Sequence, residues 1–414
     1  MFSTAVKDKS ITLVFLLIAY FLLLGLSMDT HGWGDDQYFQ VLNESGSIFE
    51  QVWSRYHQWS GRLGIELLLA YTIAWSFFWK LTIPLSIILI IYCFLKLSKY
   101  KISPIYFIVV TVLVNLIPSD ITSESFYWVT GFYNYLLPCS LGLFCFYVIH
   151  ERISNKAVIF LAFVSVFIFS YQEQVVIVFV LASVVSLYRV FALNKLFFVA
   201  LSLFNAVVLF SAPGNILRYN SSVRLYFSNY SDFGFVEKAY LGMDKMYQAF
   251  MMSDNWPLFV FLSLLAFVGY HNNEKGIFEK ISLVIVFFYL LIFCLQQQKY
   301  AFTDESLMGF KYSGTVTSNS IIGANMYKGY LVFLLVLSAA ITLMLGLARK
   351  HSTVWPALLS LFFGVLSILM LGFSPTVYAS GFRVALIFEL SLVLATLYLF
   401  KCIVNKPLIV GRYW

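Results

Sequence analysis

Long apolar stretches recur along this chain and constrain its fold more than any other feature. Stretches of about 17 to 21 apolar residues fill most of its length, and roughly 20 helical residues cross a bilayer. Lipid offers the backbone no hydrogen-bond partners, so these stretches are expected to be helices. Only 11% of the residues are charged, whereas a soluble domain carries roughly 25%. The sequence therefore predicts an all-α polytopic membrane protein.

Twelve spans are predicted, with no soluble domain between them. They cover residues 11–27, 81–97, 104–118, 134–150, 157–171, 175–191, 196–211, 256–270, 281–296, 329–347, 353–373 and 383–400. Residues 63–79 are also hydrophobic, but a full crossing there would place Lys96, Lys99 and Lys101 outside. We interpret this segment as a re-entrant, tilted or interfacial helix, which leaves the count at 12 or 13. Residues 1–414 are expected to form a single integral-membrane domain.

The basic residues predict how the chain is oriented. Lys7 and Lys9 precede the first span, which lacks a convincing cleavage site and is interpreted as an uncleaved anchor. With this N-terminus inside, the basic short loops and the C-terminal tail all fall on the cytoplasmic side. The longer polar loops then face outside, at residues 28–62, 119–133, 212–255, 297–328 and 374–382. Almost all acidic residues share that face, so we expect function there.

Several classes of function are disfavoured by the same pattern. The cytoplasmic loops are too short for a nucleotide-binding domain, and the chain has no phosphate-binding loop of the GxxxxGK type. The five histidines do not cluster, and the five cysteines show no metal-ligand spacing. The net charge of +7 is dispersed among short loops. We therefore expect no metal, no cofactor and no nucleic-acid partner.

Asp35 and Asp36 lie in the first external loop, just beyond the first span. One interpretation is an acidic loop with an aspartate capping a helix. In the other interpretation, one carboxylate accepts a proton from an attacking hydroxyl. The neighbouring carboxylate then positions the acceptor or tunes the pKa of the first carboxylate. The two interpretations do not exclude each other.

Three further external segments carry candidate residues. Trp59 and Arg62 end the first loop, where they form either an interfacial belt or one wall of a site that grips a lipid phosphate. The aromatic loop 124–138 is either a membrane belt or a sugar-binding surface. Its candidate residues for sugar binding are Glu124, Tyr127, Trp128, Tyr133 and Asn134.

The third segment combines Glu173 with residues further along the chain. Glu173 lies at the tip of a tight hairpin between two spans, where a carboxylate is costly unless it is paired or lines a wet cavity. Pro213, Gly214 and Asn215 suggest a turn, and Arg218 after them suits an anionic head group.

Taken in order, these motifs resemble the integral-membrane GT-C glycosyltransferases, most closely the phage-encoded, serotype-converting O-antigen glucosyltransferases. The resemblance rests on Asp35-Asp36, on residues 59–62 and 127–135, on Gln172-Glu173, and on residues 211–215 with Arg218. It covers about the first half of the chain. It implies a GT-C-like bundle in the bacterial inner membrane, with both termini cytoplasmic and catalytic periplasmic loops.

The resemblance also implies a reaction. A glucosyl group on undecaprenyl phosphate would pass, with inversion, to a hydroxyl of the lipid-linked O-antigen unit, which changes the serotype. Asp35 or Asp36 would be the base, Glu173 would orient acceptor or base, and Arg62 or Arg218 would hold the donor phosphate. Trp59 and Asn215 would join the aromatic loop in binding the acceptor. The implied partners are a small flippase and a cytoplasmic glucosyl-lipid synthase.

Two other classes of protein stay open. A flippase or transporter would place charges inside its spans and show twofold internal similarity, whereas here we expect the charges in loops and the two halves look unalike. An O-antigen polymerase or ligase would share the long external loops and their arginines, but it gives the carboxylate pair no evident role.

Overall fold

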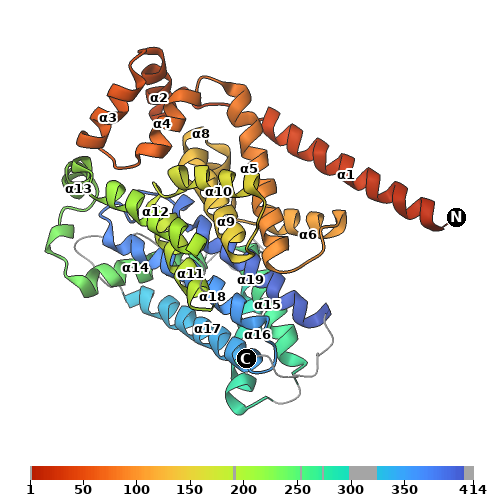
Figure 1. The fold of residues 1–414 in the computed structure, drawn as a ribbon. Helices are drawn as coiled ribbons and strands as arrows, with labels where there is room; N and C mark the ends of the chain where they lie inside the picture. Colours follow the sequence, from red (N-terminus) through yellow and green to blue (C-terminus); the bar gives the residue numbers. More distant parts are fainter. Residues whose placement is uncertain (1, 190–192, 252–253, 273–274, 298–323, 405–414) are drawn as a thin grey trace. The chain divides into compact units, whose positions relative to one another are not determined.

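A computed structural model describes residues 2–189, 193–251, 254–272, 275–297 and 324–404 (Figure 1). Every regular element in these residues is a helix, which confirms the all-α prediction. The chain divides into two compact units. Unit 1 comprises residues 1–112, 120–224 and 382–386, and unit 2 comprises residues 113–119, 225–381 and 387–414. The predicted external loop 297–328 falls almost entirely outside the described residues.

Unit 1 contains the N-terminal half of the helices. They are α1 (Phe2–Leu26), α2 (Gly34–Glu44), α3 (Ile48–Gln58), α4 (Leu63–Thr72), α5 (Ser76–Leu97), α6 (Pro104–Asn115, mostly in this unit), α7 (Ser119–Thr122), η1 (Ser123–Tyr127), α8 (Val129–Gly131), η2 (Phe132–Leu136), α9 (Leu137–His150), α10 (Lys156–Phe169), α11 (Glu173–Arg189), α12 (Leu193–Phe210), α13 (Pro213–Tyr226) and the short η5 (Arg383–Ala385). Helices α9 to α12 pack beside one another.

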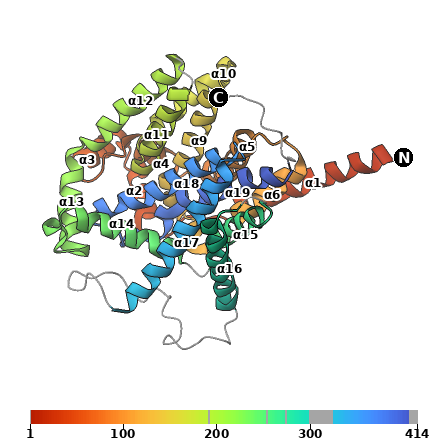
Figure 2. The ribbon, with the colours of Figure 1, turned by 90° about the horizontal axis from the view of Figure 1, so that it is seen from below.

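Unit 2 contains the remaining helices. They are η3 (Tyr230–Asp232), α14 (Phe235–Phe250), α15 (Trp256–Tyr270), α16 (Ile277–Gln297), α17 (Ala324–Ala348), α18 (Val354–Leu369), η4 (Met370–Phe373) and α19 (Leu386–Val404). Helices α15, α16 and α17 pack together, and α14 packs on α18 and η4 (Figure 2).

Six of the helical segments are long and apolar enough to cross a membrane. They are Ser76–Leu97, Val129–His150, Ile277–Leu295, Gly329–Ala348, Val354–Phe373 and Arg383–Ile403. Two bent pairs, α6 with residues 119–127 and residues 195–210 with α13, raise the number to eight if each pair is one span. Four predicted spans correspond to shorter apolar helices, Thr12–Leu26, Lys156–Phe169, Glu173–Tyr188 and Trp256–Tyr270. The chain is therefore a helical membrane protein with six to eight helices of spanning length among the described residues.

Segment 63–79 is not one helix. Helix α4 ends at Thr72 after 10 residues, and a new helix, α5, begins at Ser76 and includes Trp79. Ten residues rise only about 15 Å, too little to cross the hydrocarbon core. The interpretation of a non-crossing helix therefore holds for α4, but the aromatic end of the segment opens the next span.

Three predicted external loops are largely helical, and the first of them, residues 28–62, contains α2 and α3. Residues 119–136 form short α turns and two π-helical segments that run into α9, so this span begins near Val129 instead of residue 134. Pro213 is not in a turn but opens α13, where its missing N–H and fixed φ suit a first helical residue. The bends at the two broken pairs are 91° and 54°.

Glu389 lies in the interior of the last predicted span, contrary to the assignment of charges to loops. Glu389 belongs to α19 and to the spanning segment Arg383–Ile403, and its side chain is completely buried. Asn255 donates to its Oε1 at 2.9 Å, whereas Oε2 has no hydrogen-bond partner among the described residues.

Candidate functional site

The two neighbouring carboxylates of the first external segment have different surroundings. Asp35 is exposed, whereas Asp36 is completely buried. The backbone N–H of His31 donates to Asp36 Oδ2 at 2.9 Å. The backbone N–H of Thr130 (2.9 Å) and its hydroxyl (2.5 Å) both donate to Oδ1. Asp36 therefore fastens α2 to α8, and Asp35 is the carboxylate of the pair that a reactant can reach.

Neither aspartate caps a helix. The N-cap residue of α2 is Trp33, and both aspartates lie within the first turn. Negative charge in a first turn is favoured by the helix dipole. The capping interpretation is wrong, because α2 begins one residue before Asp35.

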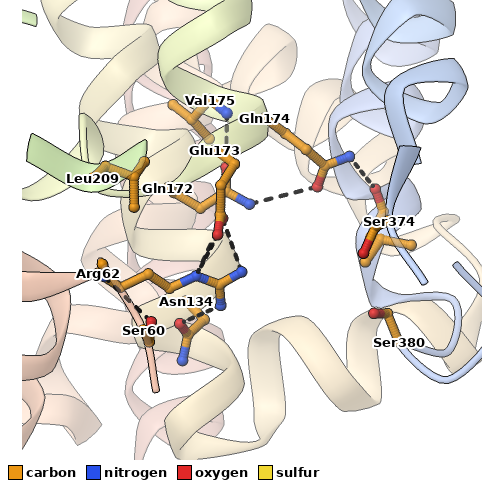
Figure 3. A network of polar contacts seen from close by, with 12 residues as sticks. Ser60, Arg62, Asn134, Gln172, Glu173, Gln174, Val175, Leu209, Ser374 and Ser380 are labelled. Atoms are coloured by element: carbon orange, nitrogen blue, oxygen red, sulfur yellow. Dashed lines mark hydrogen bonds and ion pairs between the residues drawn. The ribbon is translucent and has the colours of Figure 1, made fainter. Parts of the chain in front are cut away.

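Arg62 is held by Glu173 and Asn134. Its Nε lies 3.1 Å from both Glu173 carboxylate oxygens, and its Nη2 donates to Oε2 at 2.8 Å (Figure 3). Its Nη1 donates to Asn134 Oδ1 at 2.9 Å. Glu173 is the first residue of α11, and Arg62 immediately precedes α4. A side-chain clamp therefore joins three helical segments that are distant in sequence.

A continuous run of hydrogen bonds connects this clamp to Asp36. Asn134 Nδ2 donates to the carbonyl oxygen of Thr130 at 2.9 Å, and Thr130 donates to Asp36. The run therefore passes from Asp36 through Thr130, Asn134 and Arg62 to Glu173. Four of the sequence motifs singled out for function contribute to it.

The charges of Arg62 and Glu173 shift each other's pKa. Burial disfavours the charged form of each partner, but the positive charge of Arg62, helped by that of Arg218, lowers the pKa of the Glu173 carboxyl below its ordinary value. Against the same burial, the Glu173 carboxylate raises the pKa of the Arg62 guanidinium above its ordinary value. Both groups are therefore ionised at neutral pH, and the negative charge of Glu173 offsets one of the two arginines.

His31 is the middle ring of an aromatic cluster beside Asp36. The His31 ring stacks nearly parallel to the rings of Trp33, at 5.3 Å between centroids, and Trp128, at 6.2 Å. Arg383 places its guanidinium carbon 5.2 Å from the centre of the Trp128 ring. Trp33 is 71% exposed, so one end of this cluster presents an open aromatic face.

The other residues of the aromatic segment divide between surface and core. Tyr127 is exposed and Glu124 is partly exposed. Tyr133 is completely buried, and its hydroxyl shares a 2.6 Å hydrogen bond with Thr72. Tyr133 therefore offers no surface to a sugar and packs the helices instead.

Asn215 and the loop before Arg62 form a tight backbone contact. Asn215 Oδ1 accepts from the N–H of Gly61 at 3.1 Å, and its Nδ2 donates to Leu209 O at 2.7 Å. A Cβ on Gly214 would lie 2.3 Å from the Trp59 nitrogen. Asn215 therefore positions the loop that carries Arg62, with both ends of its amide engaged, while the Trp59 side chain stays 43% exposed.

Arg383 belongs to this site but was not predicted. Its Nε donates to the Tyr135 hydroxyl at 3.2 Å, 248 positions away in the chain. The one signal in the sequence was a cation at the external end of the last predicted span. Within unit 1, hydrogen bonds therefore join Asp36, Thr130, Asn134, Arg62 and Glu173, and Arg383 lies against Trp128. Asp35 is exposed next to Asp36.

Unit 2 has a separate buried carboxylate, Asp244. The hydroxyls of Tyr330 and Tyr378 and the amide of Gln248 all donate to it. Burial raises the pKa of the Asp244 carboxyl despite these hydrogen bonds. Each Asp244 oxygen is engaged by a neighbour, so this cluster links α14 to α17 and to the segment before η5.

No group of three or more histidine, cysteine, aspartate or glutamate side chains within the described ranges is placed to hold a metal ion. Comparisons of the chain with protein-family models, with curated proteins and with solved structures found no significant match.

Proposed function

We propose that this chain is a glycosyltransferase of the GT-C type in the bacterial inner membrane. It transfers a glucosyl group from undecaprenyl phosphate to a hydroxyl of the lipid-linked O-antigen unit at the periplasmic face. In this proposal the shorter apolar helices complete a bundle of about twelve spans, and both termini are cytoplasmic. The small flippase and the cytoplasmic synthase supply the donor.

One observation supports the proposal more than any other. The hydrogen-bonded run from Asp36 to Glu173 joins segments that lie far apart in the sequence. Asp35 is exposed on α2, the helix that Asp36 fastens to the same framework as Arg62. Transfer from a phosphate leaving group requires an exposed base and a cationic group, and this framework carries one of each, Asp35 and Arg62.

The chemistry divides between these groups. The Asp35 carboxylate accepts the proton of the acceptor hydroxyl as its oxygen attacks the anomeric carbon from the side opposite the phosphate. The bond from the anomeric carbon to the phosphate oxygen breaks, and its electron pair leaves with undecaprenyl phosphate. The product is an inverted glycosidic bond. The arginines stabilise the negative charge of the departing phosphate.

The test compares Asp35→Asn with the matched control Asp29→Asn, another exposed aspartate nearby. Membranes carrying each variant receive undecaprenyl phosphate glucose and a lipid-linked acceptor. Loss of a general base typically slows transfer by about 100-fold or more, whereas the control should keep the wild-type rate. Equal rates for wild type and Asp35→Asn, at equal expression, would remove Asp35 as the base.

A transporter of lipid-linked sugars is the second candidate, because Glu389 is a buried carboxylate inside a predicted span. Ionisable groups in that position commonly mark transport pathways. Flux of the labelled lipid across proteoliposomes without sugar transfer would favour it. An O-antigen polymerase or ligase would instead lengthen or move the polysaccharide, which gel analysis of the lipopolysaccharide distinguishes.

A further inference from the structure

Glu389 is a buried carboxyl that the proposed sugar transfer does not use. It lies on α19 and its side chain is completely buried. Within the apolar segment Arg383–Ile403 it is six residues from one end and 14 from the other. At 1.5 Å per residue, the nearer end is roughly 9 Å away. A carboxylate this far inside such a segment is costly unless a partner compensates its charge.

Asn255 fixes one side of the Glu389 carboxyl. The backbone N–H of Leu258 donates to Asn255 Oδ1 at 3.0 Å, which identifies the oxygen of this amide. Its Nδ2 donates to the carbonyl oxygen of Ala249 and to Glu389 Oε1, both at 2.9 Å. Both amide hydrogens are therefore in use, and Asn255 has no donor left for the second carboxyl oxygen.

That second oxygen, Glu389 Oε2, has no hydrogen-bond partner among the described residues. No ion pair joins Glu389 to a basic side chain in the part of the chain that the structure describes. The other charged residue of α19, Lys401, is 12 positions away, roughly 18 Å along the helix. An ionised carboxyl with one unsatisfied oxygen is far more costly to bury than the neutral acid.

The surroundings of Glu389 also oppose a negative charge. The carbonyl oxygen of Ala249 belongs to the last turn of α14, and the C-terminal end of a helix carries partial negative charge. Asp254, next to Asn255 in the chain, acts on Glu389 with a charge of the same sign. Each of these groups favours the neutral acid over the carboxylate.

The titratable groups of the neighbouring helices are engaged elsewhere. Helix α15 and helix α18, which donates a hydrogen bond to α19, carry no charged residue. On α14, Asp244 accepts from two tyrosines and a glutamine, and Lys245 acts on Asp244. Glu237 and Lys238 lie at the opposite end of α14. The hydroxyl of Tyr289 on α16 donates to a backbone carbonyl at the end of α14.

We propose that Glu389 is a proton-binding site inside the apolar part of unit 2. The proton resides on Oε2 at neutral pH, while Oε1 accepts the hydrogen bond from Asn255. Its release leaves a full negative charge beside the end of α14, so proton release is coupled to the packing of α19 on the junction of α14 and α15. Proton binding here requires neither sugar transfer nor lipid transport, and therefore goes beyond both proposed functions.

Infrared spectroscopy of the purified full chain, in a detergent without ester groups, detects this proton. The C=O stretch of a protonated carboxyl is distinct from the bands of carboxylates. At neutral pH, the difference spectrum between wild type and Glu389→Gln should contain the protonated band. The matched control Glu237→Gln, at an exposed glutamate of unit 2, should leave that band unchanged. A carboxylate band in place of the protonated band for Glu389→Gln would overturn the proposal.

A second variant keeps the test independent of how well glutamine is tolerated. Glu389→Asp retains an acid on a shorter side chain, so it should shift the protonated band without removing it. In wild type, raising the pH should convert the same band into a carboxylate band. A band that neither moves in Glu389→Asp nor responds to pH would belong to another group, and the assignment to Glu389 would be wrong.

Thermal unfolding gives a separate readout. Unfolding exposes Glu389 to water, where it ionises at an ordinary pH, whereas the folded chain keeps the proton. Wild type should therefore lose stability relative to Glu389→Gln as the pH rises. Melting temperatures of the two should approach each other at acidic pH, and the variant should melt a few degrees higher at neutral pH. A variant that melts lower than wild type at every pH would contradict proton binding.

A monovalent metal ion is the competing occupant of the unsatisfied oxygen. Spectra and melting temperatures are compared in sodium, potassium and choline chloride. The same protonated band in all three salts supports the proton. If sodium or potassium removes the band, or raises the melting temperature of wild type but not of Glu389→Gln, the site takes a metal ion and the proton assignment is wrong.

Discussion

The guanidinium of Arg62 and the carboxylate of Glu173, 111 positions apart in the chain, form a forked ion pair with Nη2 2.8 Å from Oε2. This pair connects the loop before α4 to the first residue of α11. It converts a carboxylate at the end of a predicted span, costly when isolated, into part of a satisfied network. It is also the link through which Asp36 and Glu173 belong to one framework.

Breaking this pair should destabilise unit 1. Glu173→Ala leaves the Arg62 guanidinium without its carboxylate partner. It should lower the free energy of unfolding by about 2 kcal/mol. This value lies between those of exposed and of buried ion pairs, because both side chains keep some exposure. Thermal unfolding of the purified protein measures this loss. Glu237→Ala, at an exposed glutamate of α14, is the control. Equal melting temperatures for the two variants would contradict the prediction.

The same pair predicts a dependence of stability on pH. Arg62 holds the pKa of Glu173 below its ordinary value, despite opposing burial, so the unfolded chain takes up a proton at higher pH than the folded one. The stabilisation is present above the ordinary glutamate pKa of about 4.3 and is lost as pH falls through the folded-state value. Melting temperatures measured from neutral to acidic pH should fall less steeply for Glu173→Gln than for wild type. If the melting temperatures of wild type and Glu173→Gln fell in parallel with pH, the prediction would be wrong.

The sequence identified the clamp residues because each is a polar group at the edge of an apolar stretch. Arg62, Asn134 and Glu173 all met that criterion. It could not separate Asp35 from Asp36, because their difference depends on Thr130, 94 positions later. It could not identify Arg383 either, because its contact with Tyr135 comes from tertiary packing. The helical form of residues 119–136 was missed because aromatic, turn-rich composition at an interface resembles a loop.

Asp36 and Asp35 should differ in their effect on stability. All three groups bonded to Asp36 act as donors, so Asp36→Asn would point its amide N–H toward a donor. A buried hydrogen bond lost in this way costs about 1–3 kcal/mol. Asp35→Asn, at an exposed position, should change stability by less than about 0.5 kcal/mol. Chemical or thermal unfolding of the two variants in the same detergent compares them, and a larger loss for Asp35→Asn would reverse the structural assignment.

Glycine at position 131 should be required for the packing of the aromatic segment. A Cβ there would lie 1.9 Å from the carbonyl oxygen of Glu124 and 2.9 Å from the Trp128 ring. Backbone atoms cannot move aside as a flexible side chain can, so Gly131→Ala must displace η1 or α8 and disturb the Thr130 contact with Asp36. Overpacking of this kind costs about 1–3 kcal/mol. Gly32→Ala is the matched control, because its added Cβ would meet no atom within 4 Å.

The expected result is a lowered melting temperature and reduced binding of undecaprenyl phosphate for Gly131→Ala alone. Wild-type behaviour of both variants would mean that Glu124 and Gly131 do not approach each other as described, and it would remove the support for the position of Trp128 beside Arg383.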